Sequence, residues 1–206
     1  VVKTELPDGN LAMAQAYVFN LRREKFQDRR VREALAMMFN FEWSNEQLFY
    51  GLYDRVQSFW GNSELEARGV PMGVELAVLQ PLVDQGLLNA DILTAEAVMA
   101  PVSGARQLDR KNLRRASKLM DEAGWRVNSE GMREKDGQVF TLEVLDSSPA
   151  FDRITNPMIE NMKALGIDAR LNRVDSAQES ERTRAYDFDV TTHSMRMGFE
   201  PSSGLE

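Results

Sequence analysis

The sequence predicts an α/β fold in which strands and helices alternate along the second half of the chain. Residues 140–144 and 167–171 alternate apolar and polar side chains, as strands with one buried face do. Apolar residues at helical spacing fill the stretch between them. Gly124 and Gly166 each follow an expected helix, where glycine commonly ends helical structure. This alternation favours strands joined by right-handed crossovers, with helices packed on the sheet.

The strongest helix signal covers residues 27–40. Asp28 is a suitable N-cap because its carboxylate accepts hydrogen bonds from the free amides of the first turn. The apolar stripe of this helix has the spacing i, i+3, i+4, i+7 and consists of Val31, Ala34, Leu35 and Met38. A strand is expected within residues 11–21, so the chain opens with a strand–helix unit.

The remaining elements follow from the same kinds of signal. Further helices are expected at residues 43–51, 74–84, 108–124, 147–165 and 176–184. Further strands are expected in a hairpin over residues 125–146 and at residues 167–174 and 186–190, followed by a loop from residue 191. Ser44 is the expected cap of the helix at residues 43–51. Pro81 is expected to end or kink its helix, and Pro157 to delay regular helix until Thr155 or Asn156.

Two local signals in this middle region are specific. Asp109 precedes the apolar stripe of the helix at residues 108–124 and is its expected N-cap. Asp136 followed by Gly137 predicts the tight turn of the hairpin, because both residues tolerate the left-handed backbone that such turns require.

The composition limits the classes of function. The chain has 206 residues and a net charge of −7, which argues against binding nucleic acid through bulk positive charge. It has no cysteine and one histidine, His193, so thiol chemistry is excluded and a Ser-His-Asp triad or a zinc site is disfavoured. No cofactor is expected. No apolar run approaches the roughly 18 residues that span a bilayer.

Four stretches together resemble one family. They are FNLRREKFQDRRVREALAMMFNFEW, LDRKNLRRASKLMDEAGW, MIENMKALGIDARLNRVD and YDFDVTTHSM. Each by itself is mostly a core pattern, but in this order and spacing they resemble the family-5 solute-binding proteins of bacterial ABC importers, the peptide- and nickel-binding group. The first stretch and the residues after it are most similar to the Yej-type peptide-binding branch of that family.

The resemblance implies one lobe of a two-lobed periplasmic binding protein of the class II, cluster C type, with a mixed sheet flanked by helices. It identifies residues 1–206 as the C-terminal lobe, without the N-terminal lobe and the final segment. The implied function is to bind oligopeptides or peptide-like compounds between the lobes and to deliver them to the ABC permease in the inner membrane. The implied partners are therefore the ligand, the permease subunits and the missing lobe, with no nucleic acid and no enzymatic activity.

The candidate ligand contacts fall in two places. In the loop expected after the last strand they are His193, Arg196 and Met197, and in the aromatic loop after the second helix they are Tyr53, Arg55, Ser58 and Phe59. In many oligopeptide-binding members an aspartate at the position of Met197 holds the ligand's α-amino group, so the resemblance implies that this anchor is missing. Arg196 beside it would favour an anionic group instead.

Other interpretations of these residues are open at this stage. His193 is equally a hydrogen-bonded residue at a strand end, Arg196 a solvated side chain, and the aromatic loop a surface loop with its rings tucked beneath it. For the whole chain, the alternative function is the ligand-sensing domain of a cytosolic transcriptional regulator with the same lobe. An enzyme is the least favoured class, because one histidine and no cysteine make a catalytic constellation hard to build.

Overall fold

The computed structural model describes residue 4, residues 10–196 and residue 198. The chain divides into two compact units, each of which is described by itself. The larger unit consists of Gln15–Arg55 and Pro101–Ser194, and the smaller unit of Val1–Ala14, Val56–Ala100 and Met195–Glu206. The larger unit has the α/β architecture that the sequence predicts.

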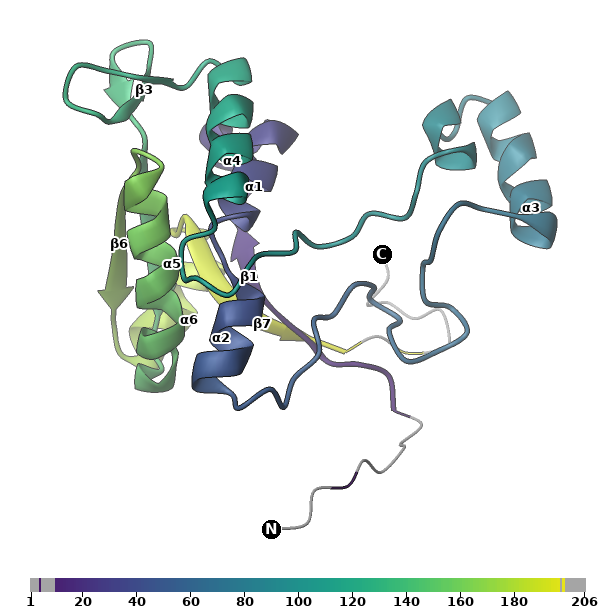
Figure 1. The fold of residues 1–206 in the computed structure, drawn as a ribbon, viewed down its shortest axis with the longest axis horizontal. Coiled ribbons are helices and arrows are strands. Elements are labelled where there is room, and N and C mark those ends of the chain that lie inside the picture. The colour runs from purple at the N-terminus through teal and green to yellow at the C-terminus, as the bar shows by residue number, and fades with distance from the viewer. Residues whose placement is uncertain (1–3, 5–9, 197, 199–206) are drawn as a thin grey trace. The chain divides into compact units, whose positions relative to one another are not determined.

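A four-stranded mixed sheet forms the centre of the larger unit (Figure 1). Its strands, in spatial order, are β1 (Ala14–Phe19), β7 (Val190–Met195), β5 (Thr141–Asp146) and β6 (Asp168–Arg173). β5 runs parallel to both of its neighbours, with Val144 opposite Leu171 on one side and Val190 on the other. β1 runs against β7, since the amide of Asn20 after β1 donates to the carbonyl of Asp189 before β7 (2.9 Å).

Three helices cover one face of this sheet: α1 (Arg29–Ala36), α4 (Arg110–Glu122) and α5 (Asp152–Ala164). The helices α1 and α4 lie against each other, and α5 packs on β6 as the crossover from β5. The sheet residues that meet their apolar stripes are fully or almost fully buried and include Leu142, Val144, Ala169 and Val190. The shorter helix α2 (Phe41–Leu48) contacts α5.

The opposite face of the sheet is covered in part by α6 (Ser176–Arg184), which connects β6 to β7. Side chains alternate along a strand, so Glu143 and Leu145 point away from the face that buries Val144. Leu145 is fully buried, and Glu143 accepts a hydrogen bond from Arg182 of α6 at 2.9 Å. Helix α6 therefore does not cover the β1–β7 half of this face.

A small antiparallel sheet follows α4. It consists of β2 (Arg126–Val127), β3 (Arg133–Lys135) and β4 (Gln138–Val139). The predicted turn between β3 and β4 is confirmed, because Asp136 and Gly137 both have positive φ angles, 53° and 76°. The predicted glycine ends are confirmed as well, with φ angles of 89° at Gly124 and 91° at Gly166.

The smaller unit is built mainly from loops around α3 (Gly73–Asp84) and a short 3-10 turn (Ala90–Leu93). Of the end or kink expected at Pro81, the end is wrong, since α3 continues to Asp84, and the kink stays a prediction. Backbone bonds hold the loops, such as the amide of Ala97 to the carbonyl of Gly69 at 2.7 Å. Among the described residues, no helix is both long enough and apolar enough to cross a membrane.

The helix caps were predicted in two cases out of three. Asp28 accepts from the amide of Arg30, and Asp109 accepts from the amide of Asn112, as expected. The cap of α2 is Asn40, which accepts from the amide of Trp43 at 2.8 Å, and Ser44 lies inside the helix. Asn40 is preferred because its side-chain amide also donates to loop carbonyls, including that of Gly104 at 2.9 Å.

Several element boundaries differ from those predicted. The hairpin expected over residues 125–146 is divided, because β2, β3 and β4 form the small antiparallel sheet whereas β5 pairs in parallel with β6 and β7. The helix expected at residues 27–40 is shorter, since α1 ends at Ala36. Helix α5 begins at Asp152 and includes Pro157, because Thr155 is completely buried and its hydroxyl bonds the Tyr17 hydroxyl at 2.7 Å, which fixes the turn before the proline. The last strand is β7, not residues 186–190. Residues before it form a turn, since Tyr186 has a φ angle of 55° and its carbonyl accepts from the side chain of Asn20 at 2.8 Å. The expected loop from residue 191 therefore begins as strand.

Candidate functional site

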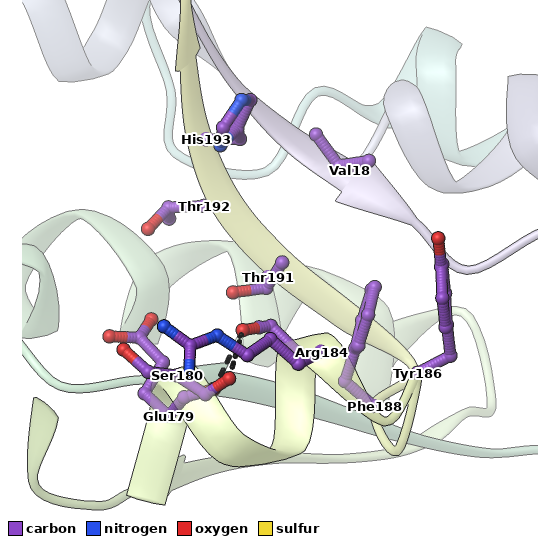
Figure 2. A pocket seen from close by; sticks show the side chains of 10 residues that line it. Val18, Glu179, Ser180, Arg184, Tyr186, Phe188, Thr191, Thr192 and His193 are labelled. Carbon is purple, nitrogen blue, oxygen red and sulfur yellow. Dashed lines mark hydrogen bonds between the residues drawn. The ribbon is translucent and has the colours of Figure 1, made fainter. Parts of the chain in front are cut away.

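An open hollow of about 690 Å³ lies between α6 and the β1–β7 half of the sheet (Figure 2). Its lining residues come from both strands, from the helix and from the turn between helix and strand: Val18, Glu179, Ser180, Thr183, Arg184, Tyr186, Phe188, Thr191, Thr192 and His193. Because all of them belong to the larger unit, the hollow is a feature of one rigid piece of the fold.

The alternation of β7 places two polar side chains at the hollow. Val190 is buried in the core on the helix-covered face, so Thr191 and His193 point to the other face. Thr191 stands opposite Leu145 of β5 and is 7% exposed, whereas His193 is exposed. The strand thus supplies a buried hydroxyl and an exposed imidazole to the same side.

Helix α6 forms the wall of the hollow and is fixed at both ends. Asp175 caps it by accepting from the amides of Ala177 and Gln178, each at 2.9 Å. The carboxylate of Glu143 on β5 holds Arg182 at 2.9 Å. Burial acts to raise the pKa of Glu143, but hydrogen bonds from neighbouring side chains outweigh it and hold this pKa below its usual value. The helix is therefore tied to the sheet by a charged pair.

The polar groups of the hollow are suited to binding. Thr191 Oγ1 is buried and has no hydrogen-bond partner among the described residues. His193 and the exposed Arg184 likewise make no hydrogen bond or ion pair to a described side chain. Figure 2 shows Thr191, His193 and Arg184 around the same space. Within the described ranges, no group of three histidine or acidic side chains is placed to hold a metal ion.

The seven residues that the sequence suggests as ligand contacts are spread over both units. Tyr53, Arg55 and His193 belong to the larger unit, and of these His193 lines the hollow. Three of the others, Ser58, Phe59 and Arg196, belong to the smaller unit. Met197 lies outside the described residues, so the missing amino-group anchor stays a prediction.

Arg55 lies against two aromatic rings of the larger unit. Its guanidinium carbon is 5.5 Å from the centroid of the Phe39 ring and 5.6 Å from that of the Phe41 ring. Its Nη1 atom is buried without a hydrogen-bond partner among the described residues. Burial lowers the pKa of Arg55, and the negative charge of Glu42 compensates in part. The Arg55 guanidinium thus packs against two aromatic rings, and its N–H groups donate no hydrogen bond to a described residue.

Tyr53 is placed by the side chain of Asn45, whose amide group donates to the carbonyl of Tyr53 at 2.6 Å and accepts from its amide at 3.1 Å. The Tyr53 ring meets Phe49 edge-on at 5.1 Å between centroids, yet it is 60% exposed. In the smaller unit Phe59 is 52% exposed. These two rings do not lie tucked beneath their loop, and they offer apolar contact area to a binding partner.

Ser58 and Arg196 differ in what they do. The hydroxyl of Ser58 accepts from the amides of Trp60 at 3.3 Å and Ala67 at 3.2 Å, so it shapes its loop. Arg196 is exposed and makes no contact with an acidic side chain within the described part of the chain.

Sequence reasoning missed the part of the hollow that α6 supplies, namely Glu179, Ser180, Thr183 and Arg184. The helix itself was predicted with its observed bounds, but its polar composition does not tell which side faces the sheet. The Thr191 hydroxyl was missed because the strand was expected to end at residue 190. The spacing of Thr191 and His193, two apart, was the signal that could have placed both on one face.

The larger unit is an α/β fold with an open hollow of mixed polar and apolar lining beside α6. The sequence matches the bacterial extracellular solute-binding proteins, family 5 (middle), over residues 3–205. The chain therefore belongs to this family.

Individual relatives agree with this assignment. The chain is 42% identical over 194 residues to the probable peptide-binding protein YejA of Agrobacterium fabrum, covering 93% of this chain and 31% of that protein. It is 33% identical over 207 residues to YejA of Escherichia coli, covering 100% of this chain and 34% of that protein. The structure of the oligopeptide-binding protein AppA of Bacillus subtilis, in complex with a nonapeptide, is similar with a TM-score of 0.62 at 20% identity, over 95% of this chain and 33% of that one.

The chain spans about a third of the length of these relatives. The family, YejA of Agrobacterium fabrum and AppA are named as binding proteins, which fits the expectation that the chain is not an enzyme and gives no support to a transcriptional regulator. The similarity to AppA, at 20% identity, establishes the fold alone.

Proposed function

We propose that this chain is the C-terminal lobe of the periplasmic substrate-binding component of an ABC importer for oligopeptides or peptide-like compounds. The ligand binds in the cleft between this lobe and an N-terminal lobe elsewhere in the full-length protein. Closure of the two lobes around the ligand then presents it to permease subunits in the inner membrane.

The observation that carries the proposal is the family match over residues 3–205, joined to 42% identity with a probable peptide-binding protein. AppA, which shares the fold, was solved with a nonapeptide, which supports a ligand of oligopeptide length.

The proposed ligand contacts are the seven residues from the sequence, with the hollow as an additional polar surface. His193 and Thr191 would meet main-chain amides and carbonyls of a peptide, because both present hydrogen-bonding atoms without a described partner. Tyr53 and Phe59 would supply exposed aromatic area. The remaining proposed ligand contacts are Arg55, Arg196, Ser58 and Met197.

Isothermal titration of the full-length receptor with pools of three- to nine-residue peptides tests the proposal. Binding of at least one pool at micromolar concentration is expected, and an H193A variant should weaken it. A receptor that binds no peptide pool would refute the peptide assignment. The matched control is S194A, the neighbouring exposed residue of β7, which lies on the other face of the strand.

The importer role is tested in cells. A strain that lacks the full-length gene should lose uptake of a peptide that the receptor binds, and the protein should be released with the periplasmic fraction. Unchanged uptake, or a protein confined to the cytosol, would contradict this part of the proposal.

A further inference from the structure

Arg55 is held rigidly but has no anionic partner. Its guanidinium carbon lies 5.5 Å and 5.6 Å from the ring centroids of Phe39 and Phe41, an arrangement in which the rings attract the cation and fix its plane. No described residue accepts a hydrogen bond from it, and its Nη1 atom is buried. Arg55 is the last residue of the first segment of the larger unit, and both rings belong to the same segment.

The acidic group whose charge acts on Arg55 is Glu42, and it already has a hydrogen-bond donor. Glu42 accepts a hydrogen bond from the amide of Ser103 at 3.0 Å, and its carboxylate is not within ion-pair distance of Arg55. Glu42 therefore moderates the charge of Arg55 from a distance without satisfying its donors.

Other sheltered arginines of the larger unit are treated differently. Arg133, whose side chain is 1% exposed, donates to the carbonyls of Leu165 at 3.1 Å and Trp125 at 2.8 Å and pairs with Asp121. Arg182 pairs with the carboxylate of Glu143 at 2.9 Å. Arg173 also has buried donors without a hydrogen-bond partner, but it pairs with the carboxylate of Asp146 at 3.0 Å, whereas Arg55 pairs with no described carboxylate.

A sheltered cation without a partner costs free energy, which an incoming anion recovers. A guanidinium presents a planar fork of donors that matches a carboxylate through two parallel hydrogen bonds. Since the Phe39 and Phe41 rings already hold the fork, little side-chain entropy is lost when the anion arrives. The ring of Tyr53, two residues earlier in the sequence, is exposed.

We propose that Arg55 binds a carboxylate of the ligand, so that this lobe selects peptides that carry one. The inference rests on the proposed peptide-binding function and adds to it the chemical group that one named residue recognises. A peptide carries this group at its C-terminus and on aspartate or glutamate side chains, and the experiment separates these two sources.

The test uses the full-length receptor with three variants. R55M removes the charge and keeps an apolar side chain of similar length against the rings, and R55K keeps the charge without the planar fork. R29M is the matched control, because Arg29 is 68% exposed and its ion pair with Glu33 lies on the surface of α1. The probes are pools of three- to six-residue peptides as free acids, the same pools as C-terminal amides, and free-acid pools without aspartate and glutamate.

We expect R55M to bind the free-acid pool about 10- to 100-fold more weakly than wild type, with R55K between them and R29M unchanged. Wild type should lose a similar factor with the amide pool if the C-terminal carboxylate is recognised. It should lose that factor with the pool without acidic residues if a side-chain carboxylate is recognised. Either loss supports the proposal. The ligand-free R55M protein should melt no lower than R29M, because it has lost an unpaired cation.

Two results would overturn the inference and leave peptide binding standing. The first is a wild type that binds all three pools equally, with R55M unchanged. The second is a ligand-free R55M protein that melts several degrees below R29M, because Arg55 would then already pair with an acid elsewhere in the full-length protein. A wild type that binds no pool would instead refute the proposed function and this inference with it.

Discussion

Removing the guanidinium of Arg133 should destabilise the protein more than removing any exposed arginine. Arg133 lies in β3, its side chain is 1% exposed, and it is among the largest side chains that the described fold buries completely. It joins the small sheet to the ends of two helices, donating to the Leu165 carbonyl after α5 and to the Trp125 carbonyl after α4. It also contacts Ser117 and Asp121 of α4.

The size of the effect follows from these partners. In an R133M variant the carbonyls of Leu165 and Trp125 lose donors at 3.1 Å and 2.8 Å, and methionine offers none. The unsatisfied buried carbonyl of Leu165 costs about 1–3 kcal/mol, and the carbonyl of the partly exposed Trp125 adds less because water replaces its donor. Asp121 adds little, since its side chain is 54% exposed and water replaces the lost partner.

Urea unfolding followed by far-UV circular dichroism measures this loss, with equal m-values confirming that the same transition is compared. R126M is the control, because Arg126 lies in the neighbouring strand β2 and is exposed. It should change the free energy of unfolding by less than about 0.5 kcal/mol. An R133M protein as stable as R126M would refute the reasoning, since it would mean that the two carbonyls find other donors.

Three further predictions concern the same unit. Gly124 and Gly166 have φ angles of 89° and 91°, but a Cβ at Gly166 would lie 2.8 Å from the Gly131 carbonyl oxygen, whereas at Gly124 it meets only a flexible lysine. G166A should therefore lower the free energy of unfolding by roughly 2–4 kcal/mol and G124A by about 1–2, and equal losses in thermal unfolding would contradict this. T191V should leave the melting temperature unchanged or raise it, because valine has the same shape and removes a buried hydroxyl without a described partner; a loss above about 1 kcal/mol would show that the hydroxyl is bonded. Burial raises the pKa of Tyr17 from 10.0 to about 12, so the neutral form is favoured in the folded state. Its contribution to stability is complete below pH 10 and is lost as the pH rises from 10 to 12, and the difference in unfolding free energy between wild type and Y17F should fall over that range.

Much of the fold was predictable because its signals are local. The N-caps Asp28 and Asp109 each bond an amide within three residues, and the turn at Asp136 and Gly137 depends on its own backbone angles. The bounds of α6 were predicted as observed, and in the structure Asp175 caps this polar helix by accepting from the amides of Ala177 and Gln178. In such places the physical cause lies within a few residues of its effect.

The structure predictions failed where residues that are distant in the sequence determine the local structure. Asn40 replaces Ser44 as the cap of α2 because its side chain also bonds the loop before α4, more than 60 residues away. The turn before β7 is held by the side chain of Asn20, which donates to the carbonyls of Tyr186 at 2.8 Å and Phe188 at 2.9 Å. No pattern within residues 186–190 reveals that contact. The candidate site suffered most from this error, because the hollow begins at the strand that was shifted.

The position of unsatisfied polar atoms separates frame from recognition surface. At the caps and at Arg133, donors and acceptors are matched, as a stable frame requires. Thr191 and Arg55 each keep a buried polar atom without a described partner, and both lie where the larger unit offers exposed side chains beside them. A third such place, around Asp146 and Arg173 at the ends of β5 and β6, differs because the two charges compensate each other at 3.0 Å. A ligand can supply the hydrogen-bond partners that the fold does not provide. Thr191 and Arg55 are therefore the positions at which binding should be tested first. Whether their polar atoms have hydrogen-bond partners depends on contacts across the fold and not on their neighbours in sequence.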